Sequence, residues 1–219
     1  MVLNISALRK PGAVTAEWLR ERLADTRLPE NPLNVTLPPG IGRWPAALRE
    51  SPGTALTPAG VLIPILERAG DLSVLLTQRS AALKHHAGQI SFPGGSMEEQ
   101  DRDVAMTAIR ETREEVGIDP QHVSVIGYLG PMPTITGYAV TPIVGLVSAA
   151  AELVIDRSEV EFAFEVPLEF LLDARNDKRV EREFEGHSVA MVEFHYEQRR
   201  IWGATAHMVL LLRQYLINK

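Results

Sequence analysis

Three glutamates lie close together in one short stretch of the chain: Glu111, Glu114 and Glu115. If residues 104–116 form a helix with about 100° per residue, the three side chains fall within one arc of about 100° that borders the apolar stripe. Carboxylates this close repel one another unless a cation lies between them. Because hard divalent ions such as Mg²⁺ and Mn²⁺ prefer oxygen ligands, we predict that the three glutamates bind one of these metals.

The helix that would carry these glutamates is predicted to run from about 101 or 103 to 116, because small and apolar residues recur along one of its faces. Gly117 follows at the position where a left-handed C-terminal cap belongs. A solvated acidic helix end, with an ion pair between Arg110 and Glu114, is the ordinary alternative to a metal site.

A pair of glycines, Gly94 and Gly95, precedes this helix in the predicted loop over 92–95. Glycine lets the backbone turn sharply and approach a metal ion or a phosphate closely. Both glycines are therefore candidate substrate-binding residues.

The stretch Arg110–Ile118 resembles the second half of the Nudix box, and the glycine pair stands where that box begins. The resemblance implies a pyrophosphohydrolase in which the three glutamates bind the metal and act in catalysis. It also implies that Arg110 is part of the catalytic machinery and orients a box glutamate through a salt bridge.

One stretch of the box departs from the usual pattern, which has a glutamate six residues after its glycine and eight before its arginine. Here Asp101 is six residues after Gly95 but nine before Arg110. The segment is thus one residue longer, with aspartate in place of glutamate. We expect Asp101 to cap the N-terminus of the helix rather than to bind metal.

Several segments outside the box are similar to the coenzyme A diphosphatase subfamily. They are Leu75–Ser80, Lys84, Gly88, Phe92–Gly95, Thr136–Pro142 and Ile201–Ala206. The longer box is also typical of that group, and the resemblance covers roughly residues 55 to 216. It implies Mg²⁺- or Mn²⁺-dependent hydrolysis of the diphosphate linkage of coenzyme A or its thioesters, giving 3′,5′-ADP and 4′-phosphopantetheine or its acyl form.

Two cations, Arg79 and Lys84, precede the glycine pair and are candidates for binding the substrate phosphates, with ordinary surface cations as the alternative. Lys84 stands where the subfamily more often has arginine, and lysine cannot make a bidentate phosphate contact. The adjoining His85 and His86 are expected to be structural or solvated rather than catalytic.

Three further residues have roles that the sequence leaves open. Glu159 or Glu161 could supply a general base or another metal ligand. Trp202 is expected to pack in the core or at a rim, with stacking on an adenine ring as the alternative.

Two other functions remain open beside the coenzyme A assignment. The box alone also fits hydrolysis of another nucleoside diphosphate derivative, such as ADP-ribose, NADH or a dinucleoside polyphosphate. A Nudix module that binds a nucleotide without cleaving it is the second alternative, but such a module often lacks box carboxylates. The presence of all three glutamates favours an enzyme.

The surrounding pattern of alternating strands and helices predicts an α/β or α+β class. Strands are predicted at 60–66, 73–78, 123–129, 139–147 and 189–196, and helices at 167–172 and 204–216. The resemblance implies a Nudix fold, in which a mixed β-sheet is sandwiched between helices and the box forms a loop–helix–loop. Residues 56–219 are predicted to form this domain. Residues 1–55 are predicted to be an N-terminal extension with a helix over 15–27 and a proline-rich loop.

Composition restricts the class of protein further. The chain has 219 residues, of which 45% are hydrophobic, which suffices for one domain with a sizeable core. It contains no cysteine, so disulfides and thiolate metal sites are excluded. The net charge of −6 argues against a nucleic-acid partner, and no apolar run is long enough to span a membrane. We expect a cytoplasmic enzyme with a small-molecule substrate, and the sequence leaves open whether it forms a homodimer.

Overall fold

The computed structural model describes residues 14–37, 56–68, 71–83, 86–184 and 186–217. Eight strands of the described chain form the main sheet: β1 (Thr57–Arg68), β2 (Asp71–Arg79), β3 (Ile90–Ser91), β4 (Gly94–Ser96), β5 (Val123–Tyr128), β6 (Met132–Pro133), β7 (Tyr138–Val147) and β8 (Val160–Pro167). Their central order is β3–β2–β1–β7–β5, and β4, β6 and β8 pair with β1, β7 and β2 respectively.

The sheet is mixed, as predicted. β1 and β7 run parallel, with Ile63 beside Val144, whereas β2 and β4 pair with β1 in the antiparallel sense. β1 and β2 confirm the strands predicted over 60–66 and 73–78 and pair with each other as an antiparallel hairpin, of which residues 69 and 70 lie outside the described part of the chain. A parallel neighbour on one side and antiparallel neighbours on the other make β1 the centre of the sheet.

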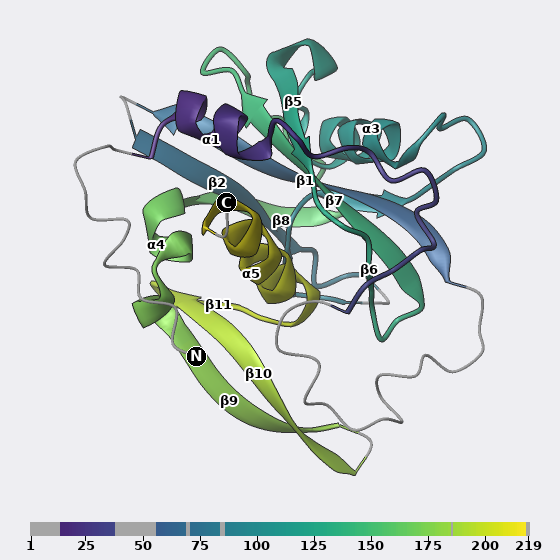
Figure 1. The fold of residues 1–219 in the computed structure, drawn as a ribbon. Coiled ribbons are helices and arrows are strands. Elements are labelled where there is room, and N and C mark those ends of the chain that lie inside the picture. The colour runs from purple at the N-terminus through teal and green to yellow at the C-terminus, as the bar shows by residue number, and fades with distance from the viewer. Residues whose placement is uncertain (1–13, 38–55, 69–70, 84–85, 185, 218–219) are drawn as a thin grey trace.

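Helices cover both faces of this sheet (Figure 1). α3 (Val104–Val116) packs on one face against β1 and β4. The other face is covered by α5 (Gly203–Ile217) with α4 (Leu168–Leu172), and α1 (Ala16–Leu23) packs beside α5 and β5. The arrangement confirms the predicted sandwich and the predicted helices over 167–172 and 204–216.

Side chains of β1 alternate between the two layers. Ile63 and Ile65 pack toward α5 and α1, while Leu62 and Leu66 pack on the side of α3. Because both faces are covered, the strand is apolar almost without interruption and shows no alternation with polar residues. β1 thereby forms a rigid base for the helix that carries the glutamates.

The N-terminal helix is part of the core. Thr15 caps α1 by accepting a hydrogen bond from the backbone N–H of Trp18, and Leu19 and Leu23 are fully buried. The helix ends at Leu23, earlier than the predicted residue 27. Residues 38–55 lie outside the described chain, so the division between residues 55 and 56 stays a prediction.

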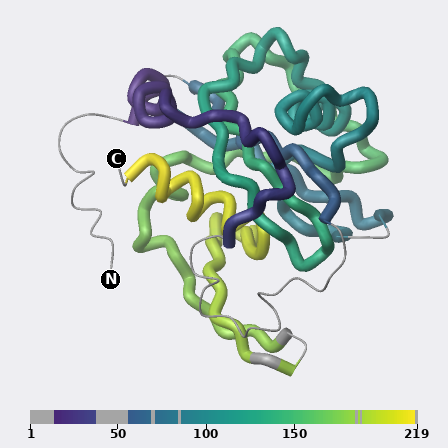
Figure 2. The backbone as a smooth tube through the Cα atoms, turned by 45° about the vertical axis from the view of Figure 1, so that its right-hand side comes forward, coloured from purple at the N-terminus to yellow at the C-terminus, as the bar shows by residue number. Residues whose placement is uncertain are grey.

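A second sheet of three strands consists of β9 (Asp177–Phe184), β10 (His187–Tyr196) and β11 (Arg199–Ile201). The hairpin of β9 and β10 projects from the main body in both views (Figures 1 and 2). β10 confirms the predicted strand over 189–196, whereas β9 was not predicted. Among the described residues, no helix combines the length and the apolarity that crossing a membrane requires.

Candidate active site

The helix α3 is held at both ends by local hydrogen bonds. At its start, the carboxylate of Asp103 accepts hydrogen bonds from the backbone N–H groups of Ala105 (3.1 Å) and Met106 (2.9 Å). At its end, Gly117 adopts a left-handed conformation with φ of 73°, which confirms the predicted cap. The N-terminal cap was expected to be Asp101, and that expectation is wrong, because Asp103 occupies the position.

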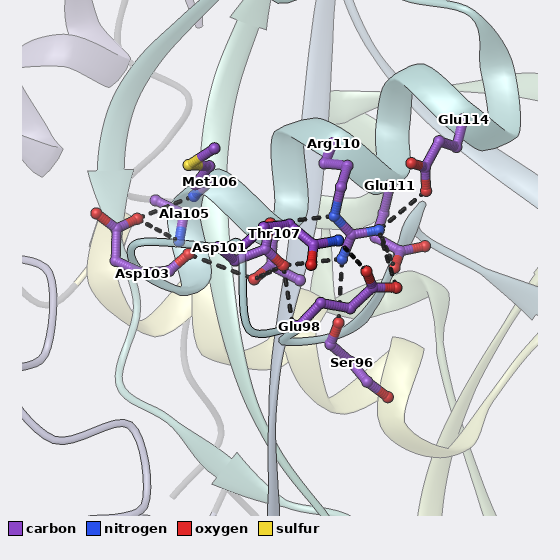
Figure 3. A network of polar contacts seen from close by, with 11 residues as sticks. Ser96, Glu98, Asp101, Asp103, Ala105, Met106, Thr107, Arg110, Glu111 and Glu114 are labelled. Atoms are coloured by element: carbon purple, nitrogen blue, oxygen red, sulfur yellow. Dashed lines mark hydrogen bonds and ion pairs between the residues drawn. The ribbon is translucent and has the colours of Figure 1, made fainter.

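Asp101 instead binds the arginine of the box (Figure 3). Its two oxygens accept hydrogen bonds from Nε (3.1 Å) and Nη2 (2.9 Å) of Arg110, and further ones from the Thr107 hydroxyl and the Glu98 backbone, both at 3.0 Å. The hydrogen bonds from Arg110 lower the pKa of Asp101 to about 2, against the opposing effect of burial. Although the box is one residue longer than usual, the side chain of Asp101 therefore still reaches Arg110.

Arg110 in turn contacts the box glutamates. Its Nη1 lies 2.9 Å from Oε1 of Glu111 and 2.9 Å from Oε2 of Glu114, and its Nη2 donates to the carbonyl of Ser96 at 3.2 Å. The salt bridge that the resemblance implied is thus present. Asp101 binds the Nε and Nη2 atoms of the same guanidinium and so fixes its orientation. The catalytic role of Arg110 stays a prediction.

The glycine pair lies directly against one of these glutamates. Gly94 and Gly95 belong to strand β4 and pair with β1, so the predicted loop over 92–95 is in part a strand. A Cβ atom on Gly95 would lie 2.5 Å from Cδ of Glu111, far inside van der Waals contact. A Cβ on Gly94, whose φ is 155°, would meet the carbonyl oxygen of Gly60 at 2.5 Å. Only glycine fits at Gly94, where the contact is with backbone, whereas a side chain at position 95 would have to displace the carboxylate of Glu111.

Glu115 is a buried carboxylate with an unsatisfied oxygen. Its side chain is 2% exposed, Oε1 lies 3.7 Å from Nη1 of Arg79, and Oε2 has no hydrogen-bond partner. Burial raises the pKa of Glu115 to about 8, and the charges of Glu111 and Glu159 act in the same direction. The cation of Arg79 and the backbone N–H of Gly94 oppose that shift. A second positive charge beside Glu115, in addition to that of Arg79, would stabilise the ionised form of this carboxylate.

Glu111 has a similar environment, and Glu114 does not. Burial raises the pKa of Glu111 despite the hydrogen bond from Arg110. The side chain of Glu114 is 56% exposed and is directed to Arg110. Within the described residues, no three histidine, cysteine, aspartate or glutamate side chains form a ready-made metal cluster. The structure therefore brings Glu111 and Glu115 together, with Glu159 acting on both through its charge.

These carboxylates face a cleft of about 440 Å³. The predicted site residues that line it are Arg79, Gly94, Gly95, Glu111 and Glu115, joined by His86, Glu159 and Trp202. Nε of Arg79 is buried and has no hydrogen-bond partner, so this cation has donor capacity to spare. Lys84 and His85 lie outside the described residues.

The cleft distinguishes the two glutamates that the sequence could not rank. Glu159 lines the cleft immediately before β8, whereas the side chain of Glu161 accepts a hydrogen bond from Gln78 at an exposed position. Nothing in the spacing of the sequence marks Glu159, because more than forty residues separate it from the box. His86 lines the edge of the cleft, where its Nδ1 lies 2.9 Å from Oε1 of Gln89.

The family model and the similar proteins both assign this chain to one family. The NUDIX domain family matches residues 56–198. A Nudix hydrolase NudL of Pectobacterium atrosepticum is 40% identical over 153 residues, which are 69% of this chain and 78% of the relative. Its counterpart in Photorhabdus laumondii is 40% identical over 156 residues, or 71% and 83% of the two chains. Both are described as uncharacterized, so their names give no substrate.

A solved structure of an Ap4A hydrolase from C. elegans is more distant, with 20% identity, a TM-score of 0.44, and coverage of 52% of this chain and 82% of its own. The family match, in contrast, extends over the main sheet, α3 and the carboxylates of the cleft. The chain therefore belongs to the Nudix family of pyrophosphohydrolases, enzymes that act on nucleoside diphosphate derivatives and generally use divalent metal ions.

Proposed function

We propose that this Nudix hydrolase cleaves the diphosphate linkage of coenzyme A or its thioesters, giving 3′,5′-ADP and 4′-phosphopantetheine or its acyl form. One observation carries the substrate assignment. Residues from each longer segment that resembles the coenzyme A diphosphatase subfamily line the same cleft as the box carboxylates. They are Arg79, Phe92, Gly94, Gly95, Thr136, Tyr138, Val140, Trp202, Gly203, Ala204 and Thr205.

The side chains in the cleft fit a divalent cation such as Mg²⁺ or Mn²⁺. Oε2 of Glu115 is buried without a partner, and the pKa values of Glu111 and Glu115 are raised first by burial and then by the neighbouring carboxylates. Glu111 and Glu115 would hold the metal with Glu159 in the same cleft, and Glu114, which is exposed and paired with Arg110, would be a further ligand. When bound, such an ion supplies positive charge to the phosphates and makes a water molecule more acidic.

The other groups of the cleft position the reactants. Arg110 holds one oxygen of Glu111 and leaves the other without a bond to the arginine. Nη1 of Arg79 faces Glu115, and the other guanidinium nitrogens of Arg79 would donate hydrogen bonds to a phosphate oxygen. A cleft carboxylate, Glu111 or Glu159, accepts the proton of the attacking water.

A panel of substrates tests the proposal. Purified enzyme is incubated with Mg²⁺ or Mn²⁺ and coenzyme A, acetyl coenzyme A, ADP-ribose, NADH or a diadenosine polyphosphate, and the products are identified by mass spectrometry. We expect selective release of 3′,5′-ADP, lost in Glu115→Gln and retained in the matched control Glu161→Gln. Faster cleavage of ADP-ribose or NADH would refute the coenzyme A assignment, and no cleavage of any compound would favour a binding module.

A further inference from the structure

A turn over residues 86–89 leads into β3 at the edge of the cleft. The backbone N–H of Gly88 donates to the carbonyl of Arg79 at 3.1 Å, and the N–H of Arg79 donates to the carbonyl of Gln89 at 2.9 Å. These two bonds continue the antiparallel pairing of β2 with β3 beyond the end of β3. The turn therefore lies directly against Arg79.

The strand pairing determines which way the side chains of this turn point. Paired residues of an antiparallel ladder project from the same face of the sheet, so the side chain of Gln89 lies on the face of Arg79. On that face, Nη1 of Arg79 lies 3.7 Å from Oε1 of Glu115. Gln89 also holds the ring of His86, because its Oε1 lies 2.9 Å from Nδ1. Arg79, Gln89 and His86 thus form one polar wall of the cleft.

The backbone of His86 is in a left-handed conformation, with φ of 59°. Few residues other than glycine adopt it, and asparagine, aspartate and histidine do so most readily. His86 is held there by the hydrogen bond from the backbone N–H of Gln89 to its carbonyl at 3.1 Å. Such conformations cluster at active sites and ligand-binding sites. The fold thereby fixes both the backbone and the ring of a histidine at the edge of the cleft.

One ring nitrogen of His86 is bonded within the chain. The amide oxygen of Gln89 only accepts hydrogen bonds, so Nδ1 carries the hydrogen of that contact. Nε2 has no partner among the contacts of the described residues. When Nε2 is protonated as well, the ring is an imidazolium that donates to Gln89 through Nδ1 and to a ligand through Nε2. A phosphate oxygen beside Nε2 favours this charged form.

We propose that His86 binds a phosphate oxygen of the substrate through Nε2, and that binding of the diphosphate takes up a proton at this ring. Arg79 and His86 then hold the diphosphate from one wall, while Glu111 and Glu115 bind its metal ion. The inference rests on the proposed function only in placing a diphosphate in this cleft, and it applies to any nucleoside diphosphate derivative. Affinity for the substrate should therefore fall as the pH rises through neutral.

Other charged or titratable groups of the cleft are Arg79, Glu111, Glu115, Glu159, His207 and Tyr138. The carbonyl of Glu159 accepts a hydrogen bond of 2.8 Å from the residue after β2, so its negative charge lies near His86 and favours protonation. The positive charge of Arg79 acts in the opposite direction. Burial lowers the pKa of His207 to about 4, so this ring is uncharged at neutral pH. Burial raises the pKa of Glu115 to about 8, but saturating Mg²⁺ keeps this carboxylate ionised throughout the test.

A binding experiment tests the role of His86 with a ligand that is not hydrolysed. The ligand is the methyl ester of α,β-methylene-ADP at its terminal phosphonate, a diester whose charge does not change between about pH 6 and pH 8.5. Wild type, His86→Asn and His122→Asn are titrated calorimetrically at saturating Mg²⁺. Asparagine readily adopts the left-handed conformation, so His86→Asn keeps the turn. His122, in the short helix η3 (Pro120–His122), does not line the cleft and is the matched control.

In the wild type, affinity should fall about tenfold or more between pH 6 and pH 8.5, because a charged hydrogen bond is lost, and binding near pH 7 should take up part of a proton. His86→Asn should bind about tenfold more weakly than wild type at pH 6, within about threefold of it at pH 8.5, and without this proton uptake. His122→Asn should follow the wild type. Wild-type affinity that does not change with pH, an unchanged pH dependence in His86→Asn, or no binding at any pH would overturn the inference.

Kinetic measurements separate this inference from the substrate assignment. For whichever nucleoside diphosphate derivative is cleaved, His86→Asn should raise KM about tenfold at pH 6 and leave kcat within about threefold. Cleavage of coenzyme A with an unchanged KM in this variant would refute the role of His86 and keep the proposed substrate. Binding of the ligand with the expected pH dependence, but no cleavage of any coenzyme A compound, would support the role of His86 and refute the proposed substrate.

Discussion

Replacing Glu115 by glutamine should stabilise the metal-free protein at alkaline pH while abolishing hydrolysis. The carboxyl group of Glu115 is 2% exposed, one oxygen has no hydrogen-bond partner, and its cation neighbour Arg79 is 3.7 Å away. Ionising the group in this place is costly, and glutamine has the same shape without the charge.

The size of the effect follows from the pKa. The ordinary value for glutamate is 4.5, and burial raises that of Glu115 to about 8. Protonated Glu115 contributes stability that is fully present below pH 4.5 and is lost as the pH rises through about 8. Glu115→Gln has no group that ionises at this position, so its free energy of unfolding does not fall in this pH range for this reason. Its advantage should grow from near zero at pH 4.5 to at most about 5 kcal/mol above pH 8, taking about 1.4 kcal/mol per pKa unit.

Urea denaturation at several pH values from 4.5 to 9, with EDTA present, measures this difference in the free energy of unfolding. Glu161→Gln is the matched control, because its side chain is exposed and bonded only to Gln78 among the described contacts. Its curve should follow that of the wild type. A difference between Glu115→Gln and wild type that does not change with pH, or that favours the wild type at pH 9, would refute the reasoning.

Three further substitutions have expected outcomes. Gly95→Ala should displace the carboxylate of Glu111, which lies 2.5 Å from the new Cβ, and lower kcat at least about tenfold with a smaller change in the melting temperature. Asp101→Asn removes a carboxylate whose pKa is lowered to about 2 by its hydrogen bonds with Arg110. The change should reduce the free energy of unfolding by about 1–3 kcal/mol at pH 7, measured by denaturation, and should lower kcat, measured from initial rates. Stability from this aspartate should also decline as the pH falls from about 4 to about 2. Glu159→Gln should lower kcat by about tenfold or more, whereas the same change at Glu161, outside the cleft, should leave turnover within about twofold.

The elements nearest the chemistry could be predicted from the sequence because their signals are local. The small and apolar stripe, the glutamates and Gly117 define α3 within a single stretch of chain. The β1–β2 hairpin has a similarly local signal, two apolar runs separated by a short turn. Local periodicity and cap chemistry were sufficient for these elements.

Other elements depend on contacts that no local pattern records. β9 has the sequence Asp-Lys-Arg-Val-Glu-Arg-Glu-Phe, and its charged side chains gave no apolar alternation. It forms because it pairs with β10 along its whole length. The strand β4 consists of residues that read as a glycine loop, and it is a strand because β1 pairs with it.

The parts of the candidate site that the sequence missed also depend on distant contacts. Asp101 was assigned to the wrong role, because the extra residue in the box changes which acid reaches the helix N-terminus and which reaches Arg110. Glu159 enters the cleft only because β8 pairs with β2. The apolar lining of the cleft comes from β1, β6, β7 and α5, and no single segment contains its pattern.

Binding of a divalent cation by the cleft carboxylates underlies every step of the proposed reaction, and calorimetric titration with Mn²⁺ tests it most directly. In buffers of different ionisation enthalpy at pH 7, binding should release about one proton, because Glu115 has a pKa of about 8 without metal and must ionise to bind it. In the wild type, the proton release should decrease above pH 8, where Glu115 is already ionised. In Glu115→Gln, the proton release and most of the Mn²⁺ affinity should be lost. Tight Mn²⁺ binding with no proton release at pH 7, or undiminished binding by Glu115→Gln, would contradict the assignment of the metal to these carboxylates.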